Sequence, residues 1–271
     1  MSGVSDIPAK WWQSGVGSSR VDCSICYLAF KPFGSHLYNV QILEHSSFGL
    51  RSAYRVMVND LGAPQIHLFP MVHLAQQSFY DDVKSKLQKC ETICVEGVRS
   101  RKVLRLTSSY RFAVKNPKLN LVLQSKIKSS DMSGDIINID VDPCEFDRKW
   151  AALSFRLKVE AFFLSPLFGF YMRFFGTREK IAKAMNMDVL KSREDILWST
   201  PQSYEMNDMI LHWRDLELLK KLDNELSVSL NKKNDIAIVF GAGHMRAIIR
   251  HLCDVRGYRV GASEWMTVFD L

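Results

Sequence analysis

The chain has 271 residues, of which 47% are hydrophobic and 24% are charged, so it is long enough to bury a substantial core. Its net charge of +7 comes from Lys and Arg residues interleaved with Asp and Glu, a pattern that argues against a nucleic-acid-binding protein. The first 20 residues lack the apolar segment of a signal peptide, and six cysteines without such a signal indicate reduced thiols. We therefore expect a cytoplasmic protein, and the sequence leaves open whether it forms homo-oligomers.

Residues 1–35 show only weak periodicity, so we expect an irregular lead-in followed by a single domain over residues 36–271. Within that domain, residues 36–45 and 52–60 each alternate apolar and polar side chains. A short connection separates them. This pattern predicts a pair of antiparallel strands near the start of the domain.

A different rhythm follows the strand pair. Residues 65–73 are typical of a strand, 76–90 have apolar residues at helical spacing, and 92–97 are again typical of a strand. This order predicts a β-α-β unit. Residues 119–124 and 135–140 are short apolar runs, which favour strands of a sheet that is covered on both faces.

The rest of the chain is mainly helical. Residues 150–198 are apolar enough to predict a helical insertion, and the next helix carries an apolar stripe that includes Leu216 and Leu219. Residues 235–249, "DIAIVFGAGHMRAII", predict a strand, a Gly-rich turn and a helix, and a last strand is expected near 264–269. The fold class is thus α/β, with a mainly parallel central sheet, flanking helices, an N-terminal antiparallel strand pair and a helical insertion.

Polar residues stand at the C-terminal ends of the predicted core strands. Parallel strands end at one edge of a sheet, which is the edge where open α/β folds bind ligands. We expect a shared site there, although each residue alone could be structural, as a hydrogen-bonded histidine or a helix cap. The five residues are His73, Glu96, Gln124, Asp140 and His244.

Two histidines and a glutamate are a suitable ligand set for a divalent metal ion that activates water. His73, Glu96 and His244 are therefore the candidate metal ligands, and Glu96 is also a candidate general base. The glycines before His244, at 241 and 243, either adopt positive φ or leave space for a ligand. We include Gly241 and Gly243, with Gln124, among the candidate cofactor-binding residues.

Two segments resemble the TraB/TIKI/GumN superfamily, which is related in fold to ChaN-like haem-binding proteins and erythromycin esterases. Residues 68–97, "LFPMVHLAQQSFYDDVKSKLQKCETICVEG", resemble its first strand, His turn, helix and strand ending in Glu. Residues 235–260, "DIAIVFGAGHMRAIIRHLCDVRGYRV", resemble its second strand, Gly-x-Gly-His turn and helix. "LNLVLQ", "GDIINIDVDPCEFDRKWAAL" and "HWRDLELLKKL" are similar to the segments between them, and the last supplies Arg214. The sequence departs from the family pattern at Pro70 and Val141, and Trp213 and Asp215 replace the family's Glu and Asn around Arg214.

For TIKI-type members the resemblance implies metal-dependent proteolysis through the two histidines and a Glu. We therefore expect a metal-dependent hydrolase that acts on a small molecule or a peptide, and a peptidase is one form that the resemblance allows. Arg214 would hold an anionic substrate group or steady the carboxylates, and Asp140 would orient a histidine. The alternatives are a protein that binds a ligand or haem without turnover, and a membrane-associated regulator.

Residues 159–176, "VEAFFLSPLFGFYMRFFG", raise the question of a membrane contact. Glu160, Pro166 and Arg173 make a spanning helix unfavourable. We expect this segment to be helical and to pack as a lid over the site at the edge of the sheet, because its aromatic surface would otherwise face water. Peripheral contact with an anionic membrane surface is the main alternative.

Overall fold

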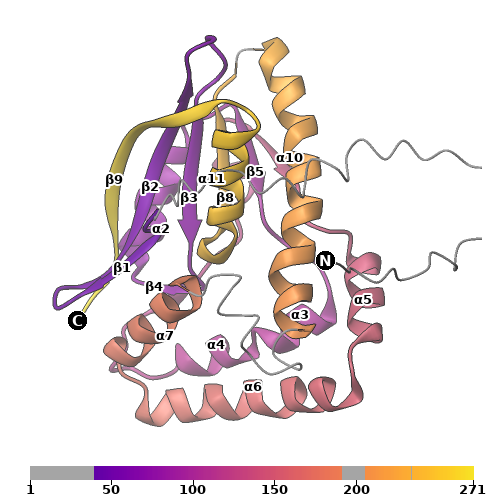
Figure 1. Cartoon of the computed structure of the whole chain (residues 1–271). Coiled ribbons are helices and arrows are strands. Elements are labelled where there is room, and N and C mark those ends of the chain that lie inside the picture. Colours follow the sequence, from indigo (N-terminus) through magenta and orange to yellow (C-terminus); the bar gives the residue numbers. More distant parts are fainter. Residues whose placement is uncertain (1–39, 191–204, 233) are drawn as a thin grey trace, which may run out of the picture. The chain divides into compact units, whose positions relative to one another are not determined.

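The computed structural model describes residues 40–190, 205–232 and 234–271, which form an α/β domain built on a mixed sheet (Figure 1). The α/β class predicted from the sequence is thereby confirmed. The described part of the sheet has seven strands. They are β1 (Leu43–Ser46), β2 (Gly49–Asn59), β3 (Ile66–Met71), β5 (Thr92–Val95), β7 (Asp135–Asn138), β8 (Ile236–Gly241) and β9 (Tyr258–Asp270).

The sheet has a parallel part and an antiparallel part. Strands β3, β8, β5 and β7 are neighbours in that order and run parallel to one another. Strand β2 pairs antiparallel with β1, β3 and β9. The predicted N-terminal antiparallel pair is therefore β1 with β2, whereas residues 36–39 of the first predicted strand lie outside the described residues. The central strand β8 is buried along almost its whole length, as its continuous apolar run predicts.

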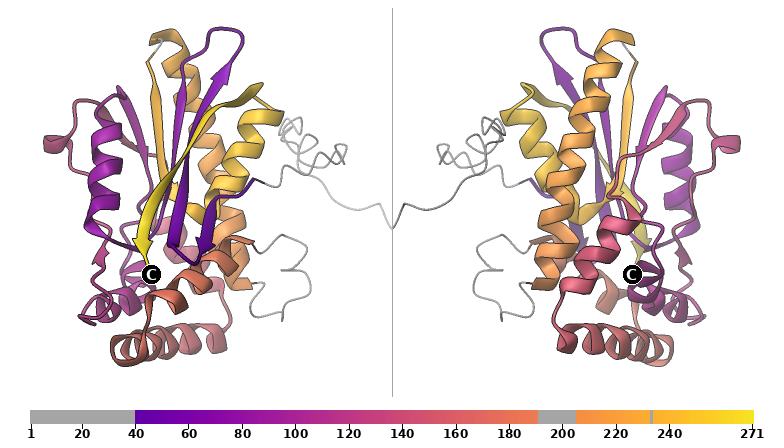
Figure 2. Two further views of the ribbon diagram at one scale, coloured as in Figure 1. Left: turned by 90° about the vertical axis from the view of Figure 1, so that its left-hand side faces the viewer. Right: turned by 90° about the vertical axis from the view of Figure 1, so that its right-hand side faces the viewer.

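Helices cover both faces of the sheet (Figure 2). Helix α2 (Gln77–Leu87) lies on one face, where it buries four side chains that recur at helical spacing. Helices α10 (Trp213–Lys232) and α11 (Met245–Asp254) lie on the other face. A π-helical turn (Asp208–His212) leads into α10. The buried side chains of α11 are Met245, Ile248, Ile249 and Leu252, so the core face of this helix has the predicted spacing.

A second group of helices lies beyond the C-terminal ends of the parallel strands (Figures 1 and 2). These are α3 (Arg101–Leu106), α4 (Ser108–Ala113), α6 (Phe155–Phe175) and α7 (Arg178–Leu190). Helix α5 (Pro143–Ala152) precedes α6 and begins at a cap in which the side chain of Asp142 accepts a hydrogen bond from the backbone N–H of Cys144. The insertion predicted over 150–198 is thus helical in its described residues, and residues 191–198 lie outside them.

The prediction that residues 159–176 bury their aromatic surface against the edge of the sheet is wrong. Helix α6 buries Leu157, Gly169 and Met172, and most of its Phe side chains stay exposed. No helix in the described part of the chain is both long and apolar enough to cross a membrane.

The strand predicted over 119–124 is also placed wrongly. Only β6 (Val122–Leu123) forms there, and it pairs antiparallel with β4 (Leu74–Ala75) in a separate small sheet. Leu123 is exposed, so the apolar run does not belong to the covered central sheet. Gln124 therefore does not follow a core strand, although it still reaches His73, as described below.

Candidate functional site

The parallel strands bring four of the predicted site residues to one edge of the sheet. Strands β3, β8, β5 and β7 run in register, so their C-terminal ends lie side by side. His73 follows β3, Glu96 follows β5, Asp140 follows β7, and His244 follows β8. The predicted C-terminal edge thus holds the three expected ligands and Asp140.

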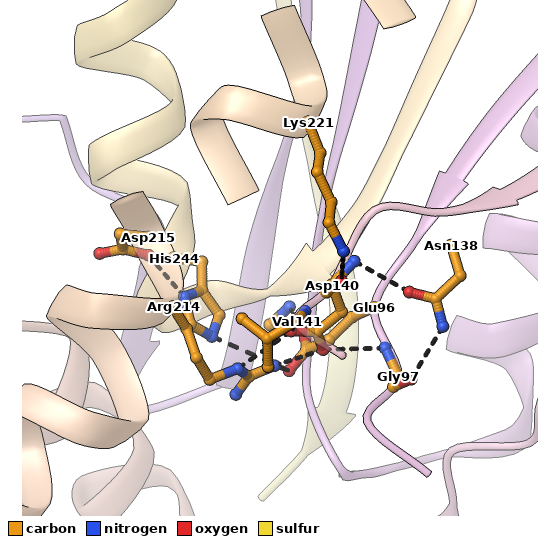
Figure 3. Close-up of polar contacts among 10 residues, drawn as sticks. Glu96, Gly97, Asn138, Asp140, Val141, Arg214, Asp215, Lys221 and His244 are labelled. Carbon is orange, nitrogen blue, oxygen red and sulfur yellow. Dashed lines mark hydrogen bonds and ion pairs between the residues drawn. The ribbon is translucent and has the colours of Figure 1, made fainter. Parts of the chain in front are cut away.

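Glu96 is the meeting point of this group (Figure 3). Its Oε1 accepts a hydrogen bond from Nη2 of Arg214 at 2.8 Å, and its Oε2 accepts one from the backbone N–H of Gly241 at 2.6 Å. Desolvation acts to raise the pKa of Glu96, but the nearby charges of His244 and Arg214 outweigh it and lower the pKa to about 2. Glu96 is therefore a carboxylate across the whole physiological pH range.

Arg214 joins Glu96 to Asp140. Its Nη2 and Nε donate to the two carboxylate oxygens of Asp140 at 2.6 and 3.1 Å, a bidentate pair. Desolvation acts to lower the pKa of Arg214, but Glu96 and Asp140 outweigh it and raise the pKa. The Asp140 side chain is 1% exposed, and the backbone N–H groups of Gly97 and Val141 also donate to it. The three charged groups thus form a network at the edge of the sheet, in which Asp140 and Arg214 are buried and Glu96 is partly exposed.

The predicted role of Asp140 is wrong. Its carboxylate binds Arg214 and two backbone N–H groups, and its backbone carbonyl accepts a hydrogen bond from Nζ of Lys221. The carboxylate that orients a histidine belongs instead to Asp215, the residue next to Arg214 at the start of α10. Arg214 was expected either to hold an anionic substrate group or to steady the carboxylates. Its hydrogen bonds to Glu96 and Asp140 agree with the second role.

His244 is held between Asp215 and Glu96 (Figure 3). It ends the 3₁₀ turn (Ala242–His244) that connects β8 to α11, and its side chain is only 5% exposed. Nδ1 of His244 lies 2.6 Å from Oδ1 of Asp215, and Nε2 lies 3.8 Å from Oε1 of Glu96. The Asp215 contact fixes the ring so that Nε2 faces the carboxylate.

His73 lies at the same edge of the sheet, where part of the residue reaches solvent. Its ring packs on the ring of Tyr110, with centroids 4.8 Å apart, and the side chain of Gln124 hydrogen-bonds to it. The backbone N–H of Gln124 also donates to the carbonyl oxygen of His73. Desolvation by the surrounding protein lowers the pKa of His73 and outweighs the charge of Glu96 and the hydrogen bond with Gln124, which act to raise it. The surroundings of His73 thus favour the neutral form of its ring.

The glycines before His244 serve close approach rather than positive φ. Gly241 has a φ of −52°, and a Cβ at this position would lie 3.0 Å from Oε2 of Glu96. A Cβ at Gly243 would lie 3.2 Å from a methyl group of Leu211. Gly241 thus lets the carboxylate of Glu96 reach the backbone N–H.

The described side chains fit the predicted metal ion poorly. In residues 40–190, 205–232 and 234–271, no three His, Cys, Asp or Glu side chains are placed to hold one ion. Both carboxylate oxygens of Glu96 already accept hydrogen bonds, and Nδ1 of His244 is bonded to Asp215. Nε2 of His244 is the atom that still faces the centre of the group.

Asp215 is the functional candidate that sequence reasoning missed, since it was noted only as a departure from a family pattern. A signal was available, because Arg214 and Asp215 adjoin at the start of an amphipathic helix. Comparisons of this chain with family models, with curated proteins and with solved structures found no match. The resemblance to the TraB/TIKI/GumN superfamily stays a prediction.

Proposed function

We propose that the protein is a hydrolase whose reacting water is held between Nε2 of His244 and Oε1 of Glu96. The position of the His244 ring supports this most, because Nδ1 is bonded to Asp215 and Nε2 lies 3.8 Å from Oε1 of Glu96. That distance is too long for a direct hydrogen bond and suits a bridging water molecule.

The chemistry follows from the three partners. The His244 ring accepts a proton from the water through Nε2, while the water oxygen bonds to an ester or amide carbonyl carbon of the substrate and the carbonyl π pair moves onto its oxygen. Asp215 keeps the ring oriented and stabilises the imidazolium. When the carbonyl re-forms, the bond from its carbon to the alcohol or amine leaving group breaks, and the imidazolium gives its proton to that group. The carboxylate of Glu96 accepts a hydrogen bond from the second O–H of the water, and Arg214 holds Glu96 in place.

A divalent metal ion bound by His73, Glu96 and His244 is the competing version of this proposal. Metal content measured on protein purified without a histidine tag separates the two. Substoichiometric metal, with no change in content in His244→Gln, supports the metal-free arrangement. About one equivalent of metal per chain in the wild type, lost in His244→Gln, would contradict the metal-free arrangement and indicate a metal centre.

The activity itself is tested with a panel of nitrophenyl esters and peptide nitroanilides, assayed with a chelator and with added Zn²⁺ or Mn²⁺. We expect turnover of at least one substrate class, and we expect it to persist in the chelator. A folded protein that binds members of the panel without turning any over would contradict the proposal and favour a non-catalytic binding protein.

A further inference from the structure

An apolar ridge runs along the outer face of α6, and the proposed hydrolase site does not use it. The ridge consists of Phe163, Leu167, Phe170 and Phe174, each more than half exposed. Their spacing of four, three and four residues places them on one side of the helix. A contiguous exposed apolar surface of this kind marks an interaction site in a folded protein.

The opposite face of α6 is anchored to the rest of the domain. Gly169 lies so close to α4 that an added Cβ would be 2.5 Å from the Cα of Ser109. Asn116 donates hydrogen bonds to the carbonyl oxygens of Met172 and Gly176 at the end of α6. The ridge is therefore presented outward on a fixed helix.

Basic side chains border the ridge. The guanidinium carbon of Arg173 lies 5.5 Å from the ring centroid of Phe174 in the ridge, and Nζ of Lys180 lies 5.4 Å from that of the neighbouring Tyr171. Residues 155–183 contain six basic and two acidic residues, so the segment carries more than half of the net charge of +7. Both acidic residues are already paired with basic ones inside the segment.

We propose that the protein binds the surface of an anionic lipid bilayer through this ridge, with α6 lying in the plane of the membrane. Phe and Leu side chains would enter the boundary between headgroups and acyl chains. The bordering Arg and Lys side chains would contact anionic headgroups, since their stems lie along the apolar surface and their charges reach outward. The four charged residues of α6 favour this interfacial position over a spanning one.

A second copy of the chain is a less suitable occupant of the ridge. A symmetric dimer through α6 would place the same basic borders against each other. The segment has no unpaired acidic residue with which to match them. Anionic lipid complements both the apolar ridge and its basic border.

The test is co-sedimentation of the 271-residue chain with vesicles of phosphatidylcholine alone and of equal parts phosphatidylcholine and phosphatidylglycerol. We expect affinity for the mixed vesicles to be about tenfold or more above that for the neutral ones, and to fall with added salt. The variant F163S/F170S/F174S should lose about tenfold or more of the binding to mixed vesicles.

The matched control is L61S/V255S, which removes two exposed apolar side chains remote from α6 and should bind like the wild type. Melting curves of both variants check that the fold is kept. Wild-type protein that stays in the supernatant, or an α6 variant that binds as well as the wild type, would overturn the proposal. Light scattering that shows a dimer in the wild type and a monomer in the α6 variant would assign the ridge to a second copy instead.

Discussion

His244 is almost fully buried and bonded to a partly buried carboxylate, so its ring supports folding as well as chemistry. A histidine in an open surface cleft would lose about 1 kcal/mol or less of stability on replacement by alanine. With Asp215 left unpaired, we now expect a loss of about 1–3 kcal/mol in the free energy of unfolding. Urea unfolding of His244→Ala, Asp215→Ala and the double variant measures this. Strictly additive losses would show that the two side chains are not coupled.

Ionisation of Glu96 makes the free energy of unfolding depend on pH below 4.5. Its pKa lies at about 2 in the folded protein, against an ordinary value of 4.5, so its ionised form contributes stability above pH 4.5. That contribution is lost as the pH falls from 4.5 towards 2. We expect Glu96→Gln to be less stable at pH 7 and to show a smaller further loss over this range. Equal pH dependence of unfolding in the two proteins would contradict the ion pair with Arg214.

At the scale of elements, helices α6 and α4 pack so closely that residue 169 has no space for a side chain. Helix propensity alone predicts that Gly169→Ala stabilises a helix, by up to about 1 kcal/mol. The added methyl group would, however, meet the backbone of Ser109 at 2.5 Å, and backbone cannot rotate away. We expect a net destabilisation of about 1–3 kcal/mol by thermal or urea unfolding. A raised melting temperature would show that α6 can move away from α4.

The elements that were predicted correctly are those whose secondary structure can be recognised from their own residues. Helix α2 has apolar residues at helical spacing, and strands β3, β5 and β8 are short apolar runs. The short run at 119–124 does not reveal its partner, and it pairs with β4 rather than with the central sheet. The apolar stripe predicted on α10 is wrong at Leu216, whose side chain is exposed. A π turn precedes the helix, and a pattern search that assumes 3.6 residues per turn does not detect such a turn.

At the scale of the whole molecule, the shared edge of the site was predictable, since parallel strands connected by crossovers must end together. Which side chains bind one another at this edge was not predictable. Arg214 lies 118 residues from Glu96 and 74 from Asp140 in the sequence, so only the packing of α10 against the sheet brings them together. The exchange of roles between Asp140 and Asp215 has the same cause.

The most direct test of the proposed site compares two histidines on the same side of the sheet. His251 also pairs with an aspartate of α10, with Nε2 2.7 Å from Oδ1 of Asp223, and so provides a matched control for His244. On any substrate that the wild type hydrolyses, we predict that His244→Gln lowers kcat by about 100-fold or more, whereas His251→Gln leaves kcat within a few-fold. Full activity in folded His244→Gln, or an equal loss in both variants, would contradict the assignment of His244 as the general base.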